Sequence, residues 1–125
     1  MASRRLALIF GLFMGRLMCS YNSVNGVPSC ASKELLTKKA REQWRFDGYV
    51  TGDCGAVSDV FNTHHYTNTT GATCAVVLDA GTDIDCGSFL PANIPNAIAS
   101  GDVRKVACAS EVEYVTLYAL HVIRR

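Results

Sequence analysis

Asp53 is the residue of this sequence best placed to do chemistry. It follows the apolar run of the stretch GYVTGDCGAV (48–57) and stands between Gly52 and Cys54. A carboxylate near glycines has little steric cover, so a ligand can approach it closely, and glycine lets the chain turn sharply after a strand. An aspartate in such a place also caps turns and helices. The residue types alone leave both roles open, a reactive carboxylate and a turn cap.

Other polar residues follow predicted strands in the same way. Tyr21 and Asn22 come after a first strand, and Asp83 and Asp85 lie at a third. Reactive groups of parallel α/β proteins are displayed at the carboxyl ends of the strands. The topology therefore predicts that these residues converge with Asp53, although they are far apart in the sequence.

His64 and His65 suggest two hypotheses, a metal site and a role in proton transfer. Adjacent histidines point apart in an extended chain, however, and no third ligand stands at a suitable spacing. We therefore interpret both as polar loop residues, and we expect neither a metal nor a cofactor.

Six cysteines stand at positions 19, 30, 54, 74, 86 and 108, without a C-x-x-C pair. An even number is typical of a secreted protein with disulfides, and the sequon at Asn68 permits glycosylation in that compartment. Spacing does not select among the 15 full pairings that six cysteines allow. Any one of them can equally be a small buried hydrophobic residue.

The elements that would hold these residues alternate between strand and helix. We expect a helix capped by Ser32 with Leu36, Ala40 and Trp44 on one face, a polar loop at 54–70, and a helix that stops at Gly81. We expect strands at 16–22, 49–53 and 82–86. A turn-rich loop is expected at 22–30, and a proline-bearing loop followed by a short helix at 87–101. The last expected element is an amphipathic helix at 104–123.

This alternation predicts right-handed βαβ units and a parallel sheet. Three strands cannot close a barrel, and a complete eight-fold barrel typically needs about 250 residues. With 125 residues, the chain is long enough for roughly half of a (β/α)8 barrel.

Composition excludes some functions. The 12 Lys and Arg residues balance 11 Asp and Glu residues, and apolar residues make up 49% of the chain, so a nucleic-acid partner is not indicated. Arg4 and Arg5 precede an apolar run, Leu6 to Gly15, which resembles the start of a secretory signal peptide. The run is too short for a stable membrane span. A buried strand or a non-homologous start at 1–16 is the alternative.

Four motifs together resemble one enzyme family, the N-terminal catalytic domain of glycoside hydrolase family 3, and within it the plant β-xylosidase and α-L-arabinofuranosidase branch. They occur in the family's order and are MCSYNSVNGVPSC (18–30), FDGYVTGDCGAV (46–57), HHYTNT (64–69) and LDAGTDIDCGSFL (78–90). The resemblance implies an α/β fold, the incomplete C-terminal part of a (β/α)8 TIM barrel, over residues 17–125.

The resemblance also implies roles for individual residues. Asp53 matches the nucleophile of a retaining double displacement, and Tyr21 matches a tyrosine that lines the sugar subsite beside it. Asp83 and Asp85 match a motif that is chiefly architectural, and Cys54 matches a cysteine that packs or forms a disulfide. The implied function is that of a secreted, extracellular enzyme that hydrolyses terminal β-xylosyl or α-L-arabinofuranosyl groups of cell-wall polysaccharide, with an oligo- or polysaccharide substrate.

The sequence departs from the family at several points. Gly52 stands where a serine is usual, and Gly55 stands where the branch commonly has a second acid. The upstream strands that clamp the sugar, and the second domain that brings the acid/base, have no counterpart here. The isolated chain is therefore expected to be inactive. The alternative to an enzyme segment is a non-catalytic remnant or a weak carbohydrate-binding or interaction protein.

Overall fold

The computed structural model describes residues 15–104. Its centre is a parallel pair of short strands, β1 (Arg16–Cys19) and β4 (Tyr49–Gly52), in the register Leu17 to Val50 and Cys19 to Gly52. This confirms the expected parallel arrangement. The first strand ends at Cys19, three residues before the expected boundary, and leaves Tyr21 in the loop beyond it.

The expected third strand is reduced to one bridging residue. Ile84 pairs in parallel with Thr51, donating to the Val50 carbonyl and accepting from the Gly52 amide. The Val50 amide is bound instead by the Asp83 side chain at 2.8 Å. Because that side chain replaces a backbone acceptor, regular pairing does not extend toward residue 82.

Helix η2 (Glu34–Gln43) connects the two strands, and it is a π-helix. Ser32 accepts from the Leu35 amide, as the expected cap requires. Leu36 and Ala40 are buried as expected, but Trp44 is 68% exposed, so its place on the buried face was wrong. The Trp44 amide bonds to the carbonyl of Lys39, five residues back, and this wider turn moves residues four apart off a common face.

The segment 54–70 is not a continuous loop, since it contains helix α2 (Ala56–Asn62). Ala56, Val57 and Val60 are buried on one side of this helix. The sequence did not predict this helix because the segment is rich in polar residues and the helix has no side-chain cap. The recurrence of apolar residues at 56, 57, 60 and 61 was the signal that could have revealed it.

The next two helices follow the expected order. Helix α3 (Thr70–Ala80) is capped by the Thr69 hydroxyl and ends at Gly81, whose φ of 104° is left-handed. Helix α4 (Phe89–Ser100) starts earlier than expected and includes the prolines assigned to a loop. Pro91 is tolerated because amides of a first helical turn lack an intrahelical partner anyway.

The turn-rich loop contains a small hairpin, β2 (Ser23–Val24) and β3 (Val27–Pro28), followed by the 3₁₀ turn η1 (Ser29–Ala31). Asn25 and Gly26 both have positive φ, which a two-residue hairpin turn requires.

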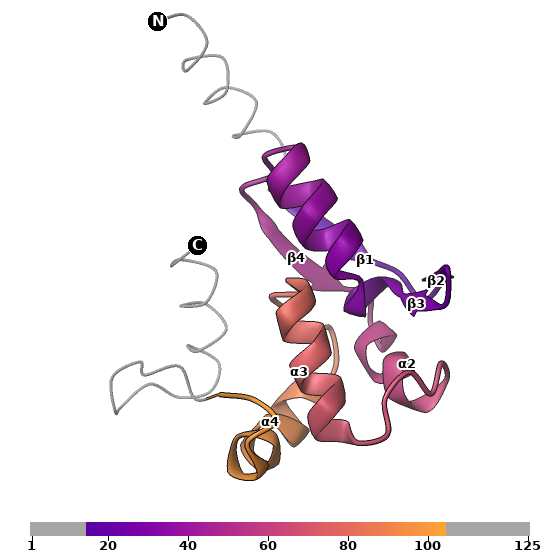
Figure 1. Ribbon diagram of the computed structural model, residues 1–125, viewed down its shortest axis with the longest axis vertical. Coiled ribbons are helices and arrows are strands. Elements are labelled where there is room, and N and C mark those ends of the chain that lie inside the picture. Colours follow the sequence, from indigo (N-terminus) through magenta and orange to yellow (C-terminus); the bar gives the residue numbers. More distant parts are fainter. Residues whose placement is uncertain (1–14, 105–125) are drawn as a thin grey trace, which may run out of the picture.

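Helix α3 is central to the packing and contacts α4, η1, α2 and η2 (Figure 1). One buried cluster joins the strands to these helices, with Val50, Val57, Val77 and Leu90 fully buried. Among residues 15–104, no helix is long and apolar enough to cross a membrane. The amphipathic helix expected at 104–123 and the apolar run at 6–15 lie essentially outside the described residues.

Candidate active site

Asp53 lies at the carboxyl end of β4, immediately beyond Gly52. Its amide donates to the Cys19 carbonyl at 2.9 Å, and its carbonyl accepts from Ala56 at the start of α2. Side chains alternate along a strand, so Asp53 continues the face of Thr51, opposite the buried Val50. The backbone is therefore fixed on both sides, while the side chain is only half-buried.

Cys54 connects Asp53 to its surroundings through three groups. Its amide donates to Asp53 Oδ1 at 2.7 Å, and its carbonyl accepts from the Tyr21 hydroxyl at 2.8 Å. Its sulfur forms a disulfide with Cys86, whose carbonyl accepts from the Gly55 amide. The loop that presents the carboxylate is thus tied to the segment that leads into α4.

This disulfide removes Cys54 from thiol chemistry. A second disulfide joins Cys19 to Cys30 and anchors the end of β1 to η1. Cys74 is unpaired among the described cysteines and is buried. Burial raises the pKa of the Cys74 thiol to about 11, so this thiol is protonated at neutral pH and a poor nucleophile. Cys108 lies outside the described residues.

Tyr21 stands beside Asp53, as the topology predicted. Partial removal from water raises the pKa of Tyr21, and the nearby charge of Asp53 and hydrogen bonding to it raise it further. A phenol has one proton to donate, and the Tyr21 hydroxyl donates it in a hydrogen bond to the Cys54 carbonyl at 2.8 Å. We therefore attribute the effect of Asp53 on the pKa of Tyr21 mainly to the charge of Asp53. The phenol is therefore protonated and within the field of the carboxylate.

The two glycines that flank Asp53 and Cys54, Gly52 and Gly55, have structural reasons. Gly55 has a φ of 91°, a conformation that side chains rarely adopt, and a Cβ on Gly52 would lie 3.0 Å from Val57 Cγ2. Both amides are bound, Gly52 to the Ile84 carbonyl and Gly55 to the Cys86 carbonyl. Any residue larger than glycine at position 55 would be strained in this backbone.

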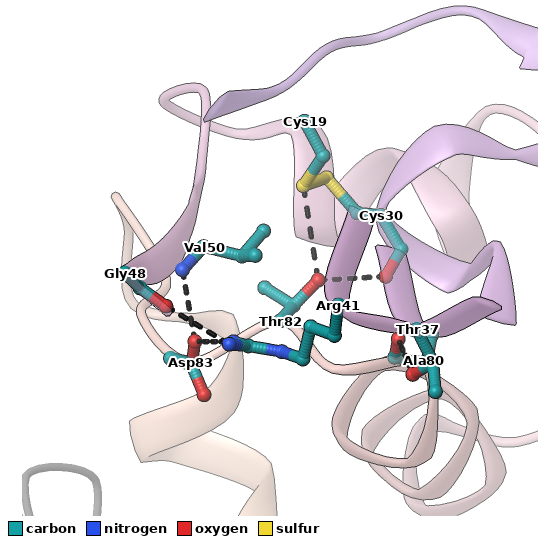
Figure 2. Close-up of polar contacts among 9 residues, drawn as sticks. All are labelled: Cys19, Cys30, Thr37, Arg41, Gly48, Val50, Ala80, Thr82 and Asp83. Atoms are coloured by element: carbon teal, nitrogen blue, oxygen red, sulfur yellow. Dashed lines mark hydrogen bonds and ion pairs between the residues drawn. A yellow bond between two sulfur atoms is a disulfide. The ribbon is translucent and has the colours of Figure 1, made fainter. Parts of the chain in front are cut away.

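Asp83 binds Val50, near the start of β4, and has a structural role there (Figure 2). It is 2% exposed and accepts from the Val50 amide at 2.8 Å and from Arg41 Nη2 at 2.6 Å. Arg41 also donates to the Gly48 carbonyl. This buried ion pair joins η2 to β4. The topological expectation that Asp83 converges with Asp53 was wrong, whereas the architectural role implied by the resemblance agrees with these contacts.

Further polar contacts tie the same elements together (Figure 2). The Thr82 hydroxyl donates to the Cys30 carbonyl at 2.9 Å, and the Thr37 hydroxyl donates to the Ala80 carbonyl at 2.9 Å. The end of α3 is therefore fixed against η2, and the residue after Gly81 is fixed against η1.

The remaining candidates have distinct places. Asp85 accepts from the Leu90 amide in the first turn of α4. The Asn22 carbonyl accepts from both the amide and the hydroxyl of Ser29, which anchors the loop. His64 Nε2 lies 2.7 Å from the Tyr21 carbonyl, a contact that the sequence did not predict. Within the described part of the chain, no three His, Cys, Asp or Glu residues cluster as a metal site would require. Asn68 is exposed, just before the residue that caps α3.

These features define a class of protein, a parallel α/β segment that displays a carboxylate at the carboxyl end of a strand. The sequence profile described as "Glycosyl hydrolase family 3 N terminal domain" matches residues 9–117. The chain therefore belongs to glycoside hydrolase family 3, as part of its N-terminal domain.

Curated relatives agree with this family. The probable exo-1,4-beta-xylosidase xlnD of Neosartorya fischeri is 47% identical over 88 residues, which is 68% of this chain and 11% of the relative. The probable beta-D-xylosidase 7 of Arabidopsis thaliana is 48% identical over 82 residues, 66% of this chain and 11% of the relative. The chain thus spans about a tenth of the length of these proteins.

Solved structures agree as well. The exo-beta-xylosidase XlnD, in complex with a xylobiose aziridine activity-based probe, is 47% identical with a TM-score of 0.69, over 71% of this chain and 12% of that one. A beta-glucosidase of Erythrobacter marinus is 30% identical with a TM-score of 0.62, over 70% of this chain and 12% of that one. The expected fold, part of a TIM barrel, and the resemblance to xylosidases are both confirmed.

Proposed function

We propose that this chain carries the nucleophile of a retaining exo-glycosidase that removes β-xylosyl groups, or α-L-arabinofuranosyl groups, from cell-wall polysaccharides such as xylan or arabinan. The observation that carries the proposal is the position of Asp53 at the carboxyl end of β4, with Oδ1 fixed by the Cys54 amide and Tyr21 alongside. The identity to xylosidases supports the choice of sugar.

In the proposed reaction, the Asp53 carboxylate attacks the anomeric carbon and forms a covalent glycosyl ester as the bond to the leaving oxygen breaks. A second carboxyl group, about 5–5.5 Å away, protonates that oxygen and then takes a proton from the water that hydrolyses the ester. The resemblance assigns that acid to a domain outside this sequence. We therefore propose that the isolated chain is catalytically silent, and that its missing partners are the other barrel strands and that domain.

The test of Asp53 uses a chimera in which residues of this chain replace the matching segment of the 47% identical XlnD. We expect the chimera to hydrolyse an aryl β-xyloside and to be labelled at Asp53 by the xylobiose aziridine probe. Asp53→Asn should abolish labelling and lower kcat by a factor on the order of 10⁴, as loss of a nucleophile does in other enzymes.

Asp79→Asn is the matched control, since Asp79 pairs with Lys33 on the surface and should leave labelling unchanged. Labelling of another residue, or persistence of labelling in Asp53→Asn, would refute the assignment of the nucleophile. Release of nitrophenol by the unmodified 125-residue chain, absent in its Asp53→Asn variant, would instead refute the proposed silence.

We also propose that the protein is secreted and glycosylated at Asn68. The two disulfides favour an oxidising compartment, and exposure of Asn68 allows a glycan there. Expression through a secretory pathway should give a mass shift that enzymatic deglycosylation removes and Asn68→Gln abolishes. A shift that persists in Asn68→Gln would place the glycan elsewhere, and no shift in the unmodified chain would contradict glycosylation at Asn68.

A further inference from the structure

His64 is a polar side chain in contact with Tyr21 to which neither the sequence motifs nor the proposed reaction assigns a role. It follows the end of α2, and its amide bonds back to the Asp59 carbonyl at 2.8 Å. The half-buried imidazole reaches across to the Tyr21 carbonyl, with Nε2 at 2.7 Å from that oxygen. The contact joins segments 43 residues apart in the sequence.

The chemistry of this contact fixes the direction of the hydrogen bond. A backbone carbonyl only accepts, so Nε2 must carry the proton. Both the neutral Nε2–H tautomer and the imidazolium satisfy this requirement. The Nε2–H of His64 is therefore the donor that holds the Tyr21 carbonyl.

Tyr21 needs such support because the core does not hold its ring. The residue is 47% exposed and stands outside the buried cluster. Two hydrogen bonds hold it instead, one from His64 to its carbonyl and one from its hydroxyl to the Cys54 carbonyl. Loss of either would release one end of the residue from its place beside Asp53.

We propose that His64 is a positioning residue that holds the backbone of Tyr21, and so its phenol, beside Asp53, with no contact of its own to the substrate. The role as an aid to catalysis rests on the proposed function of Asp53. The geometry itself is tested without any glycoside.

The experiment measures nitration of Tyr21 by tetranitromethane at pH 8 in the full chain, with peptide mapping by mass spectrometry. Nitration requires the phenolate, which the charge of Asp53 disfavours while Tyr21 is held beside it. In His64→Ala we expect the rate at Tyr21 to rise several-fold. His64→Gln keeps a hydrogen-bond donor, so Tyr21 should still be nitrated slowly. His65 is an exposed neighbour, so in His65→Ala the nitration rate of Tyr21 should match that of the unmodified chain.

An unchanged rate in a folded His64→Ala, or an equal rise in His65→Ala, would overturn the proposal. If His64→Ala fails to fold, the tautomer of His64 in the unmodified chain decides. Nitrogen-15 NMR should show the neutral ring protonated at Nε2, and protonation at Nδ1 would overturn the proposal. Neither measurement involves catalysis. A negative result would refute the positioning role of His64 without bearing on the labelling of Asp53, and absence of that labelling would not bear on the contact between His64 and Tyr21.

Discussion

At the scale of single residues, the carboxylates of Asp53 and Asp83 differ in burial and in hydrogen-bond partners, and these differences give them different roles. Asp83 is almost fully buried and is paired with Arg41, as a buried charge must be. Asp53 is half-buried, and its carboxylate accepts from the adjacent amide of Cys54. Asp53 is therefore accessible from solvent, whereas the Asp83 carboxylate is used within the fold.

Removal of the Asp83 carboxylate should destabilise the chain strongly. In Asp83→Ala the Arg41 guanidinium, whose side chain is 18% exposed, loses its partner, and the Val50 amide loses its acceptor. We expect the free energy of unfolding to fall by about 3–5 kcal/mol, measured by urea denaturation.

The control is Glu34→Gln, which removes an exposed pair with Lys38 and should cost at most about 1 kcal/mol. An equal decrease in the free energy of unfolding of the two variants would show that the buried pair stabilises the fold no more than the exposed pair does.

At the scale of elements, the sequence located the segments with strong local signals. Helix α3 has a threonine cap and a terminal glycine, and both act through neighbours in sequence. Helix α2 was missed because its stability comes from burial of Val57 and Val60 against the rest of the core, a tertiary effect. The exposure of Trp44 was missed because no local pattern distinguished a π-helix from an α-helix here.

The same division applies to the site. Asp53 and Tyr21 were predicted from strand ends and motifs, because parallel strands bring their carboxyl ends together. Asp83 was misplaced because the short pairing around Ile84 turns its side chain toward Arg41. The contact of His64 with Tyr21 depends on how α2 folds back, which spacing does not encode.

At the scale of the whole molecule, the sheet has one covered and one open face. Met18, Thr51 and Ile84 are partners across the sheet and therefore share a face. Met18 is 63% exposed and Ile84 is 41% exposed, whereas Val50 on the other face is fully buried. Within residues 15–104, β1 pairs with β4 alone, so the described sheet also has an unpaired edge.

An open apolar face and a free edge should make the isolated chain associate. We expect sedimentation velocity to show oligomers, and the double variant Met18→Lys and Ile84→Lys to reduce their average mass. Val24→Lys, which changes an exposed residue of the hairpin, should not. A monomeric unmodified chain, or the same reduction in Val24→Lys, would contradict this expectation.

The sequence by itself determined the parallel α/β class, the stop of α3 at Gly81, and the place of Asp53 after a strand, because each depends on residues adjacent in the chain. The tertiary structure alone decided the two disulfide pairings, the burial of Asp83 with Arg41, and the reach of His64 to Tyr21. Each of these joins segments distant in sequence, and their meeting is set by how the helices pack against the strands.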